Sequence, residues 1–174
     1  MKYKTFETER LIIRPTSEED AHFIFQLLNS PKWLEYIGDR NIKSIEEAKE
    51  YIRKKMTPQL IKLGYSNYTI ISKKDQQKIG TCGLYDREGL DGIDIGFAFL
   101  PNYEGKGFGF EASNRLKNAA FHDFNIKTLL GITLKENLAS QKLLKKLGLE
   151  FSKIIKLPND SEELLLYRLE QRTT

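Results

Sequence analysis

A glycine-rich segment just past the middle of the chain constrains the fold more than any other feature. Gly105, Gly107 and Gly109 alternate after an apolar run that ends at Leu100 and before a helix-like run over 108–121. This order of strand, glycine turn and helix N-terminus points successive backbone N–H groups and a helix dipole at one spot. Glycine permits the left-handed backbone and the close approach that an anion requires. The segment therefore predicts a pyrophosphate cradle, with a ligand-free strand-to-helix turn as the alternative.

Two familiar phosphate-binding fingerprints do not fit this segment. The dinucleotide fingerprint requires G-x-G-x-x-G, whereas this chain has G-x-G-x-G. The P-loop requires Ser or Thr directly after its Gly-Lys pair, whereas Gly107 follows Gly105-Lys106 here. Both of those folds also carry the motif on their first strand, and several strand-like runs precede it in this chain. The cradle therefore belongs to another class of fold.

The length predicts one domain over residues 1–174, and the mild positive charge would suit an anionic small cofactor. The chain has 28 basic and 24 acidic residues, a net charge of +4, and the basic residues are dispersed. Dispersed charge favours solvated helix faces over a nucleic-acid interface, although a basic nucleic-acid binder remains a third hypothesis for function. No apolar run approaches the ~20 residues of a membrane span. We therefore expect no membrane partner and no specific nucleic acid.

Cysteine and histidine usage points to a reduced compartment without a metal centre. Cys82 is the only cysteine, and His22 and His122 are the only histidines, so we expect no disulfide and no metal site. Cys82 lies in a strand-like run and is predicted to be a core thiol. The N-terminal residues lack the apolar core of a signal peptide, and the expected location is the cytoplasm.

The remaining runs predict an α+β domain in which helices interrupt a largely antiparallel sheet. Pro31–Trp33 is expected to break the first helix, and Pro58 to kink or end the second, which a capping-box pattern at Ser44 begins. Gly148 is expected to end the last helix. Strand-like runs cover 11–13, 68–72, 79–85, 93–100, 128–133, 154–157 and 164–169, and helix-like runs cover 17–28, 44–56, 108–121 and 137–147.

Three segments in this order make the chain similar to the GNAT N-acetyltransferase superfamily. They are the strand and glycine loop over 94–112, the Asn137-x-x-Ser140 helix start followed by residues 146–149, and the opening over 7–15. The opening, together with Ile79-Gly80-Thr81 and the Pro-x-Tyr before the loop, most resembles the ribosomal-protein N-terminal acetyltransferase branch. The resemblance implies a mostly antiparallel sheet of six to seven strands, splayed at the central strands, with helices on both faces.

The resemblance implies acetyl-CoA as the co-substrate and no metal. The backbone amides of Lys106, Gly107, Phe108, Gly109 and Phe110 would bind its pyrophosphate. The strand Phe97, Ala98 and Phe99 would hydrogen-bond the pantetheine arm, as an added strand does. Asn137 and Ser140 would contact the same arm.

Two positions depart from the family pattern. Glu104 stands where relatives usually have Gln or Arg, and an acid repels a nearby phosphate. Leu144 stands where many relatives have a tyrosine that protonates the departing thiolate, and Ser140 is the substitute candidate. Both departures leave open a CoA-binding module without catalysis.

The chemistry of direct acyl transfer selects the candidate catalytic residues Asp94 and Ser140. The amine must lose a proton to a base, and the carbonyl oxygen needs an N–H donor, here on the 97–99 strand. Asp94 is the candidate base because it precedes Gly96-Phe97 on the same strand, and Asp86 and Glu88 are weaker alternatives. No convincing nucleophile–base pair is present, which favours a ternary complex over an acyl-enzyme.

An aromatic-polar segment after the first helix is the expected acceptor site. Trp33 and Tyr36 belong to it, and Tyr85, with Glu35 or Asp39, would also face the acceptor; simple packing of the two aromatics is the alternative. The favoured acceptor is a protein N-terminal amine, and the nearest alternative is a small amine such as a polyamine, amino sugar or antibiotic. We also expect a homodimer through the edge of the last hairpin at 164–169.

Overall fold

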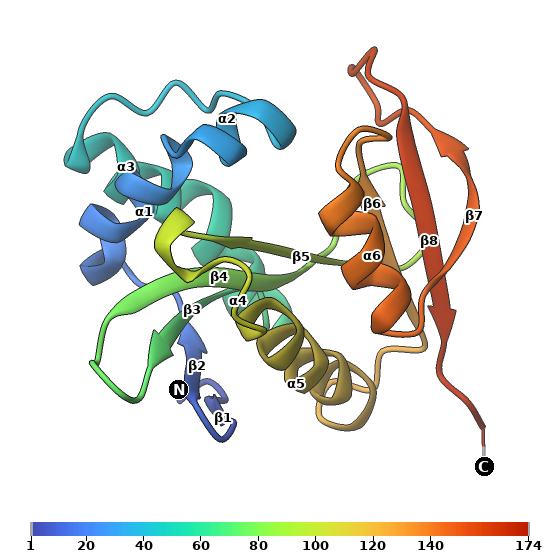
Figure 1. The fold of residues 1–174 in the computed structure, drawn as a ribbon, viewed down its shortest axis with the longest axis horizontal. Coiled ribbons are helices and arrows are strands. Elements are labelled where there is room, and N and C mark those ends of the chain that lie inside the picture. The colour runs from blue at the N-terminus through green and yellow to red at the C-terminus, as the bar shows by residue number, and fades with distance from the viewer. Residues whose placement is uncertain (1, 174) are drawn as a thin grey trace.

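One eight-stranded sheet organises the molecule (Figure 1). The structure is a computed structural model that describes residues 2–173. The strand order is β1-β2-β3-β4-β5-β6-β8-β7, and every neighbouring pair is antiparallel except β5 and β6, which are parallel. The strands are β1 (Phe6–Glu7), β2 (Leu11–Pro15), β3 (Asn67–Ser72), β4 (Lys78–Tyr85), β5 (Ile93–Phe99), β6 (Thr128–Thr133), β7 (Glu150–Ile155) and β8 (Leu164–Glu170). The helices are α1 (Ala21–Leu28), α2 (Pro31–Tyr36), α3 (Ile45–Tyr51), α4 (Thr57–Leu63), α5 (Phe108–His122) and α6 (Leu138–Lys146).

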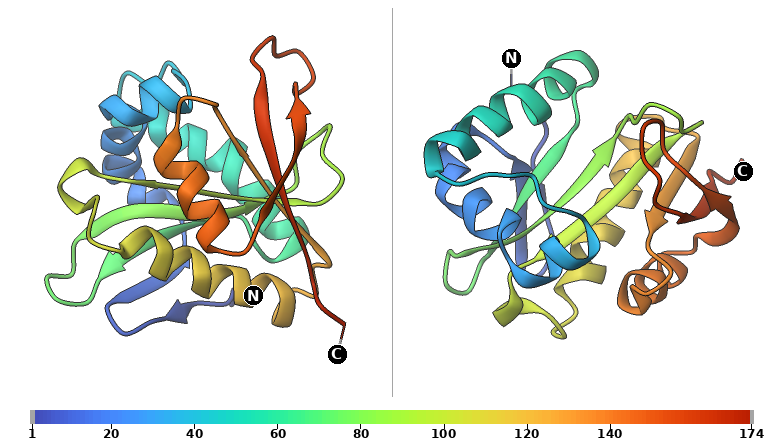
Figure 2. Two further views of the ribbon diagram at one scale, coloured as in Figure 1. Left: turned by 45° about the vertical axis from the view of Figure 1, so that its right-hand side comes forward. Right: turned by 90° about the horizontal axis from the view of Figure 1, so that it is seen from above.

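The sheet splays open between its two parallel strands. Strands β5 and β6 share only the pairs Ile93–Leu129 and Asp94–Leu130. Beyond Asp94, β5 continues along β4, while β6 continues along β8, so the two central strands diverge (Figure 2). The predicted α+β class and the splay at the central strands are therefore confirmed.

Helices cover both faces of the first half of the sheet, as expected. On one face α5 contributes Ala112, Leu116 and Ala119 to a core with Leu11, Tyr68 and other strand side chains. On the other face the buried sides of α1 and α3 form a second core, against which Ala98 of β5 packs. The alternating side chains of β5 thus contact both cores, which fixes the strand that borders the splay.

The strand count of six to seven was too low by at least one. Phe6 and Glu7 form a short edge strand whose Phe6 pairs with Ile13. Two residues carry no readable period, which is why the sequence did not reveal β1. The penultimate strand also begins earlier than the predicted 154–157, at Glu150 directly after the Gly148 turn.

The predicted break of the first helix at Pro31 is confirmed, because α1 ends at Leu28, but the short helix α2 that follows was missed. Pro31 opens α2 at a first-turn position, where its missing N–H needs no partner. Pro58 sits in the first turn of α4, and the helix from Ser44 continues through a π-helical turn, Ile52–Met56. The predicted capping at Ser44 is confirmed, because its hydroxyl accepts a hydrogen bond from the Glu47 amide at 3.1 Å.

The last hairpin corrects the expected dimer edge. Strand β8 lies inside the sheet, between β6 and β7, so the 164–169 edge is not free. The exposed edge strand is β7, where Phe151 and Ile154 are more than half exposed. Within the described part of the chain, no helix combines the length and apolar character needed to cross a membrane.

A fully buried carboxylate joins the start of α1 to the sheet. Asp20 has no exposed surface and accepts hydrogen bonds from Arg14 at 2.7 and 2.8 Å and from the Ser17 amide at 2.9 Å. Lys78 of β4 forms a further ion pair with it at 2.7 Å. Burial opposes ionisation of Asp20, but these partners prevail and lower its pKa to about 2.

We expect Asp20→Asn to lower the free energy of unfolding by about 3 kcal/mol at pH 7, because two cations lose their partner. Since the folded pKa lies below the unfolded value, the stabilisation is present above pH ~4 and disappears as pH falls toward ~2. Urea unfolding of the wild type and of Asp20→Asn, at pH 7 and again at pH ~2, measures the difference in the free energy of unfolding. The exposed neighbour variant Glu19→Gln is the control, and an equal loss for both variants at pH 7 would contradict the assignment.

Candidate active site

The splay between β5 and β6 opens into a cleft of about 600 Å³. Its floor is the end of β4 and the start of β5, and its walls come from α2, the π-helical turn, α6 and the loop before β8. Seven residues singled out in the sequence meet there: Trp33, Tyr36, Tyr85, Asp94, Phe97, Asn137 and Ser140. The structure therefore gathers the predicted catalytic and acceptor-site residues in one place.

The other predicted cofactor residues lie outside this cleft lining. Ala98 packs against the α1–α3 core and Phe99 against the α5 core, so their side chains leave the cleft. The loop residues 106–110 follow β5 after a 3₁₀ turn, Pro101–Tyr103, at the opposite end of the strand from Asp94. An extended ligand would have to follow β5 to join the two places.

The glycine loop has the backbone that the sequence predicts. Gly105 and Gly107 have φ values of 70° and 82°, in the left-handed region. Gly107 is the N-cap of α5, and none of the side chains in residues 2–173 caps this helix end. The first-turn N–H groups of α5 therefore remain available to an anion, and the helix dipole favours negative charge at this point.

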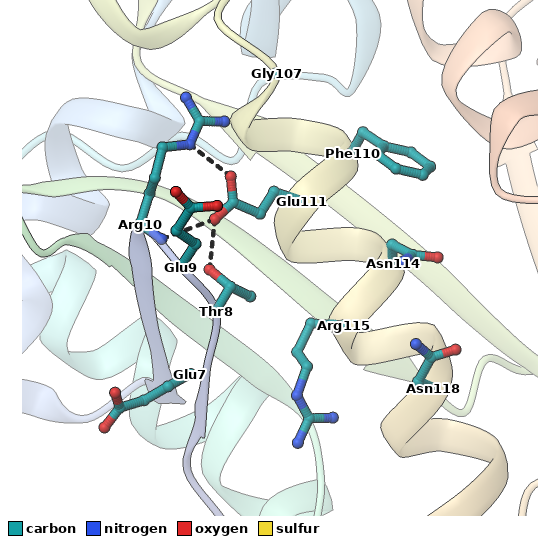
Figure 3. Close-up of a pocket in the computed structure, with 10 residues that line it drawn as sticks. All are labelled: Glu7, Thr8, Glu9, Arg10, Gly107, Phe110, Glu111, Asn114, Arg115 and Asn118. Atoms are coloured by element: carbon teal, nitrogen blue, oxygen red, sulfur yellow. Dashed lines mark hydrogen bonds and ion pairs between the residues drawn. The ribbon is translucent and has the colours of Figure 1, made fainter.

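The opening segment of the chain braces this loop from the side of β2 (Figure 3). Arg10 donates through Nε to Glu111 at 2.6 Å and through Nη1 to the Lys106 carbonyl at 3.0 Å, and its guanidinium lies 4.2 Å from the Phe108 ring centroid. Thr8 donates to the other oxygen of Glu111 at 2.6 Å. The acidic residue in the first turn of α5 is thus neutralised beside the cradle.

Asp94 occupies the base of the cleft, where the two strands part. Its side chain is 2% exposed, and Arg87 donates to Oδ2 at 2.6 Å. Burial raises the pKa of Asp94 to about 6, and the Arg87 charge only partly offsets that effect. The carboxyl group can therefore exchange a proton near neutral pH, as a general base must.

Tyr85 lies flat on a floor made by two glycines. A Cβ on Gly83 would lie 2.2 Å from the Tyr85 hydroxyl, and one on Gly96 would lie 2.9 Å from its ring. Arg87 stacks on the ring at 4.9 Å, and the hydroxyl donates to Asn67 Oδ1. These contacts hold the Tyr85 ring in one position in the cleft.

The start of α6 forms the opposite wall. Asn137 is the N-cap, and its Oδ1 accepts from the Ser140 amide at 3.1 Å. Its Nδ2 group and the Ser140 hydroxyl remain for a ligand, so capping and ligand contact are compatible. Leu144 also lines the cleft, but it is 1% exposed and packs on Gly131 of β6, so this helix position offers no acid.

The structure also shows the surroundings of Glu104 and Cys82. Glu104 is paired with Lys32 of α2 at 2.5 Å, which links the loop to that helix. Cys82 is fully buried near Ser113, and burial raises the pKa of its thiol to about 12, so it is a core residue as predicted.

Four contributors to the site were not recognised from the sequence: Arg10, Asn67, Arg87 and the Gly83–Gly96 pair. Arg10 and Glu111 stand 101 positions apart, and no local pattern joins them. Gly83 and Gly96 each lie inside a strand-like run, and a glycine there is a signal for the close approach of another group. The two glycines could therefore have indicated that a side chain packs on the sheet at this point.

Comparison with known proteins agrees with this geometry. Residues 10–150 match the family described as acetyltransferase (GNAT) domain. The chain is 31% identical over 149 residues to the uncharacterized N-acetyltransferase p20 of Bacillus licheniformis, covering 84% of this chain and 83% of that protein.

Two solved structures share the fold at low sequence identity. One is RimL, a ribosomal L7/L12 alpha-N-protein acetyltransferase in complex with coenzyme A, with a TM-score of 0.80, 18% identity, and coverage of 96% of this chain and 98% of that one. The other is spermidine N-acetyltransferase from Vibrio cholerae in complex with CoA and spermine, with a TM-score of 0.77, 17% identity, and coverage of 94% and 97%. From its sequence and its fold together, the chain belongs to the acetyltransferase (GNAT) family.

Proposed function

We propose that this protein transfers the acetyl group of acetyl-CoA to a primary amine, and that the favoured acceptor is a protein N-terminal amine. The observation that carries this proposal is the splay. It leaves the backbone of β5 beyond Asp94 without a strand partner on the β6 side, between an uncapped helix N-terminus and a buried carboxyl group. Unpaired strand groups require partners, and an extended diamide supplies them.

We assign the cofactor side to the loop and to the two walls of the splay. The amides of residues 106–110 bind the pyrophosphate, the backbone at Phe97, Ala98 and Phe99 binds the pantetheine arm, and Asn137 and Ser140 contact the same arm. The lack of a side-chain cap on α5 supports the first assignment. The position of Asn137, Ser140 and Phe97 in the cleft lining supports the others.

We assign the chemistry to Asp94, the β5 backbone and Ser140. Asp94 accepts the proton of the attacking amine, directly or through water, which its pKa of about 6 supports. A backbone N–H of β5 stabilises the oxygen that becomes negatively charged during attack. Ser140 is the one hydroxyl of α6 in the cleft lining, and it donates a hydrogen bond to the departing thiolate.

Charge in the cleft supports a peptide acceptor over a polyamine. Acidic lining residues are opposed by cationic ones, so a polycation would meet repulsion as well as attraction. The acids are Glu35, Asp94, Asp160 and Glu162, and the cations are Arg40, Lys55 and Arg87. Trp33 and Tyr36 of α2 remain the proposed aromatic contacts of the acceptor.

An acceptor screen tests this assignment. Acetyl-CoA is mixed with peptides that begin with Ser or Ala and with spermidine, and products are identified by mass spectrometry. Acetylation confined to the peptide N-terminus supports the proposal. Faster acetylation of spermidine would favour the small-amine alternative, and binding of acetyl-CoA without transfer to any amine would favour the binding module. Homodimer formation and cytoplasmic location stay predictions.

Arg10→Gln is expected to weaken acetyl-CoA binding about fivefold, because the loop carbonyl at Lys106 and the Glu111 carboxylate lose their brace. Calorimetric titration measures the dissociation constant. The control is Arg168→Gln, which removes an exposed arginine–glutamate pair of the same 2.6 Å length on β8. Equal affinity in wild type and Arg10→Gln would show that the loop holds its shape without the brace.

A further inference from the structure

A chain of hydrogen bonds leads from the cleft into the buried interior. The Tyr85 hydroxyl contacts Asn67 Oδ1, and Asn67 Nδ2 donates to Thr16 Oγ1 at 2.8 Å. Thr16 and Thr69 share a hydrogen bond at 2.8 Å, and Thr69 Oγ1 donates to Asp20 Oδ2 at 3.0 Å. All members except Tyr85 are at most 4% exposed. Buried polar groups destabilise the fold unless each has a hydrogen-bond partner. This chain of hydrogen bonds therefore holds its members in one arrangement.

Asp20 determines which group donates and which accepts at each step of this chain of hydrogen bonds. Its carboxylate is held ionised by Arg14 and Lys78, and an ionised carboxylate can only accept. Thr69 must therefore donate to Asp20, which leaves its oxygen to accept from Thr16. Thr16 has then used its proton and accepts from an N–H donor.

The same logic fixes the amide and the phenol. Asn67 must turn its Nδ2 group toward Thr16, so its Oδ1 faces Tyr85. Tyr85 must then donate its single proton to Asn67. Burial raises the pKa of Tyr85 above its usual range, so the phenol keeps that proton at neutral pH. Only the lone pairs of the hydroxyl remain for the cleft.

Tyr85 is also placed beside the proposed base. Tyr85 of β4 and Asp94 of β5 are directly paired in register, and both line the cleft. Paired residues of antiparallel strands have Cα atoms about 4.5–5.5 Å apart and project to the same face. A substrate nitrogen at this point can therefore meet two acceptors that come from adjacent strands.

We propose that the Asn67–Thr16–Thr69–Asp20 chain fixes Tyr85 as a hydrogen-bond acceptor that selects primary amines. This inference rests on the proposed acetyl transfer and specifies its acceptor class. A neutral primary amine has one lone pair for attack and two N–H bonds, one directed to Asp94 and one to Tyr85. A neutral secondary amine has only one N–H and leaves an acceptor unpaired. Tyr85 is a binding residue here, and Asn67, Thr16, Thr69 and Asp20 are positioning residues.

Three variants separate this role from simple packing. Tyr85→Phe removes the hydroxyl and keeps the ring on Gly83 and Gly96. Thr69→Val removes the link to Asp20, so that Thr16 loses its acceptor and the Asn67 amide can turn. Thr69→Ser restores the hydroxyl in the same place. If Thr69 served only to fill space, Thr69→Val and Thr69→Ser would not differ in whether the Tyr85 hydroxyl donates or accepts.

The first readout needs no substrate. The ¹³Cζ resonance of Tyr85, identified by its absence in Tyr85→Phe, reports whether the hydroxyl donates or accepts. We expect Thr69→Val to shift this resonance and Thr69→Ser to leave it close to its wild-type position. An unshifted resonance in Thr69→Val would overturn the proposed polarity, whatever the activity of the protein.

The second readout is the preference for a peptide with N-terminal Ser over the same peptide with N-methyl-Ser, measured as a ratio of kcat/KM. We expect Tyr85→Phe and Thr69→Val each to reduce this ratio about tenfold, the size of one hydrogen bond, and Thr69→Ser to rescue it. In the double variant Tyr85→Phe/Thr69→Val the loss should not add, since Thr69 acts through Tyr85. An additive loss, or an unchanged ratio in Tyr85→Phe, would overturn the selection role.

Calorimetric binding of acetyl-CoA to each variant keeps the two proposals apart. Intact binding with the wild-type amine preference in Thr69→Val would refute the inference alone. Absence of acetyl-CoA binding in the wild type would refute the proposed function, and the resonance of Tyr85 would still decide whether the chain has the stated direction.

Discussion

Gly107→Val should raise the dissociation constant for acetyl-CoA about a hundredfold. Gly107 has a φ of 82° and forms the N-cap of the helix whose amides make the proposed cradle. A β-branched residue resists this backbone, and its Cβ would lie 3.3 Å from Arg10 Nη2, a tight contact with the brace. The loop would have to shift, and the N–H groups would no longer converge.

Gly64→Val is the matched control for this substitution. Gly64 has a φ of 83°, ends α4, and a Cβ there would meet nothing within 4 Å. It therefore carries the same backbone strain without contact to the loop. Calorimetric titration of both variants, with a thermal melt of each, separates lost binding from lost stability. Similar affinities in the two variants would contradict a pyrophosphate site at Gly107.

Asp94→Asn should lower kcat by about 10²–10³-fold and leave the KM for acetyl-CoA close to that of the wild type. The amide cannot take a proton from the amine, while its size and its contact with Arg87 are retained. The wild-type kcat/KM should rise with pH through about 6 as Asp94 ionises, and again near 8 as the peptide amine loses its proton. The variant should keep only the upper rise.

Asp91→Asn controls for a general charge effect, because Asp91 is an exposed carboxylate three positions before Asp94. Steady-state rates between pH 5 and 9, with a peptide acceptor, decide the matter. A variant at Asp94 that retains the turnover and both rises of the wild type would remove Asp94 from the role of base and return attention to Asp86 and Glu88.

Short sequence patterns were enough to predict those parts of the site whose residues lie close together in the sequence. Gly105, Gly107 and the start of α5 were predictable because a left-handed turn before a helix has a short signature. Asn137 and Ser140 were predictable because three positions on a helix share a face. Asp94 was singled out through its place near the start of the 93–100 strand, ahead of Phe97, and its burial agrees with a perturbed carboxyl group.

Contacts between distant segments could not be predicted in the same way. The Arg10–Glu111 brace and the hydrogen-bond chain from Tyr85 to Asp20 join distant segments, and strand pairing together with the packing of helices on the sheet brings them together. Register depends on the packing of whole faces, which a single run of residues does not encode. The short helix that starts at Pro31 and the helix that continues past Pro58 were missed for a different reason, since a proline that opens a helix and one that ends it look alike in sequence.

The most direct test of the account is calorimetric titration of the wild-type protein with acetyl-CoA. We expect saturable binding with a dissociation constant in the micromolar range, because the loop, the unpaired strand and the α6 wall are all in place before the ligand arrives. No binding at millimolar acetyl-CoA would contradict it, and the glycine loop would then be a structural turn between β5 and α5.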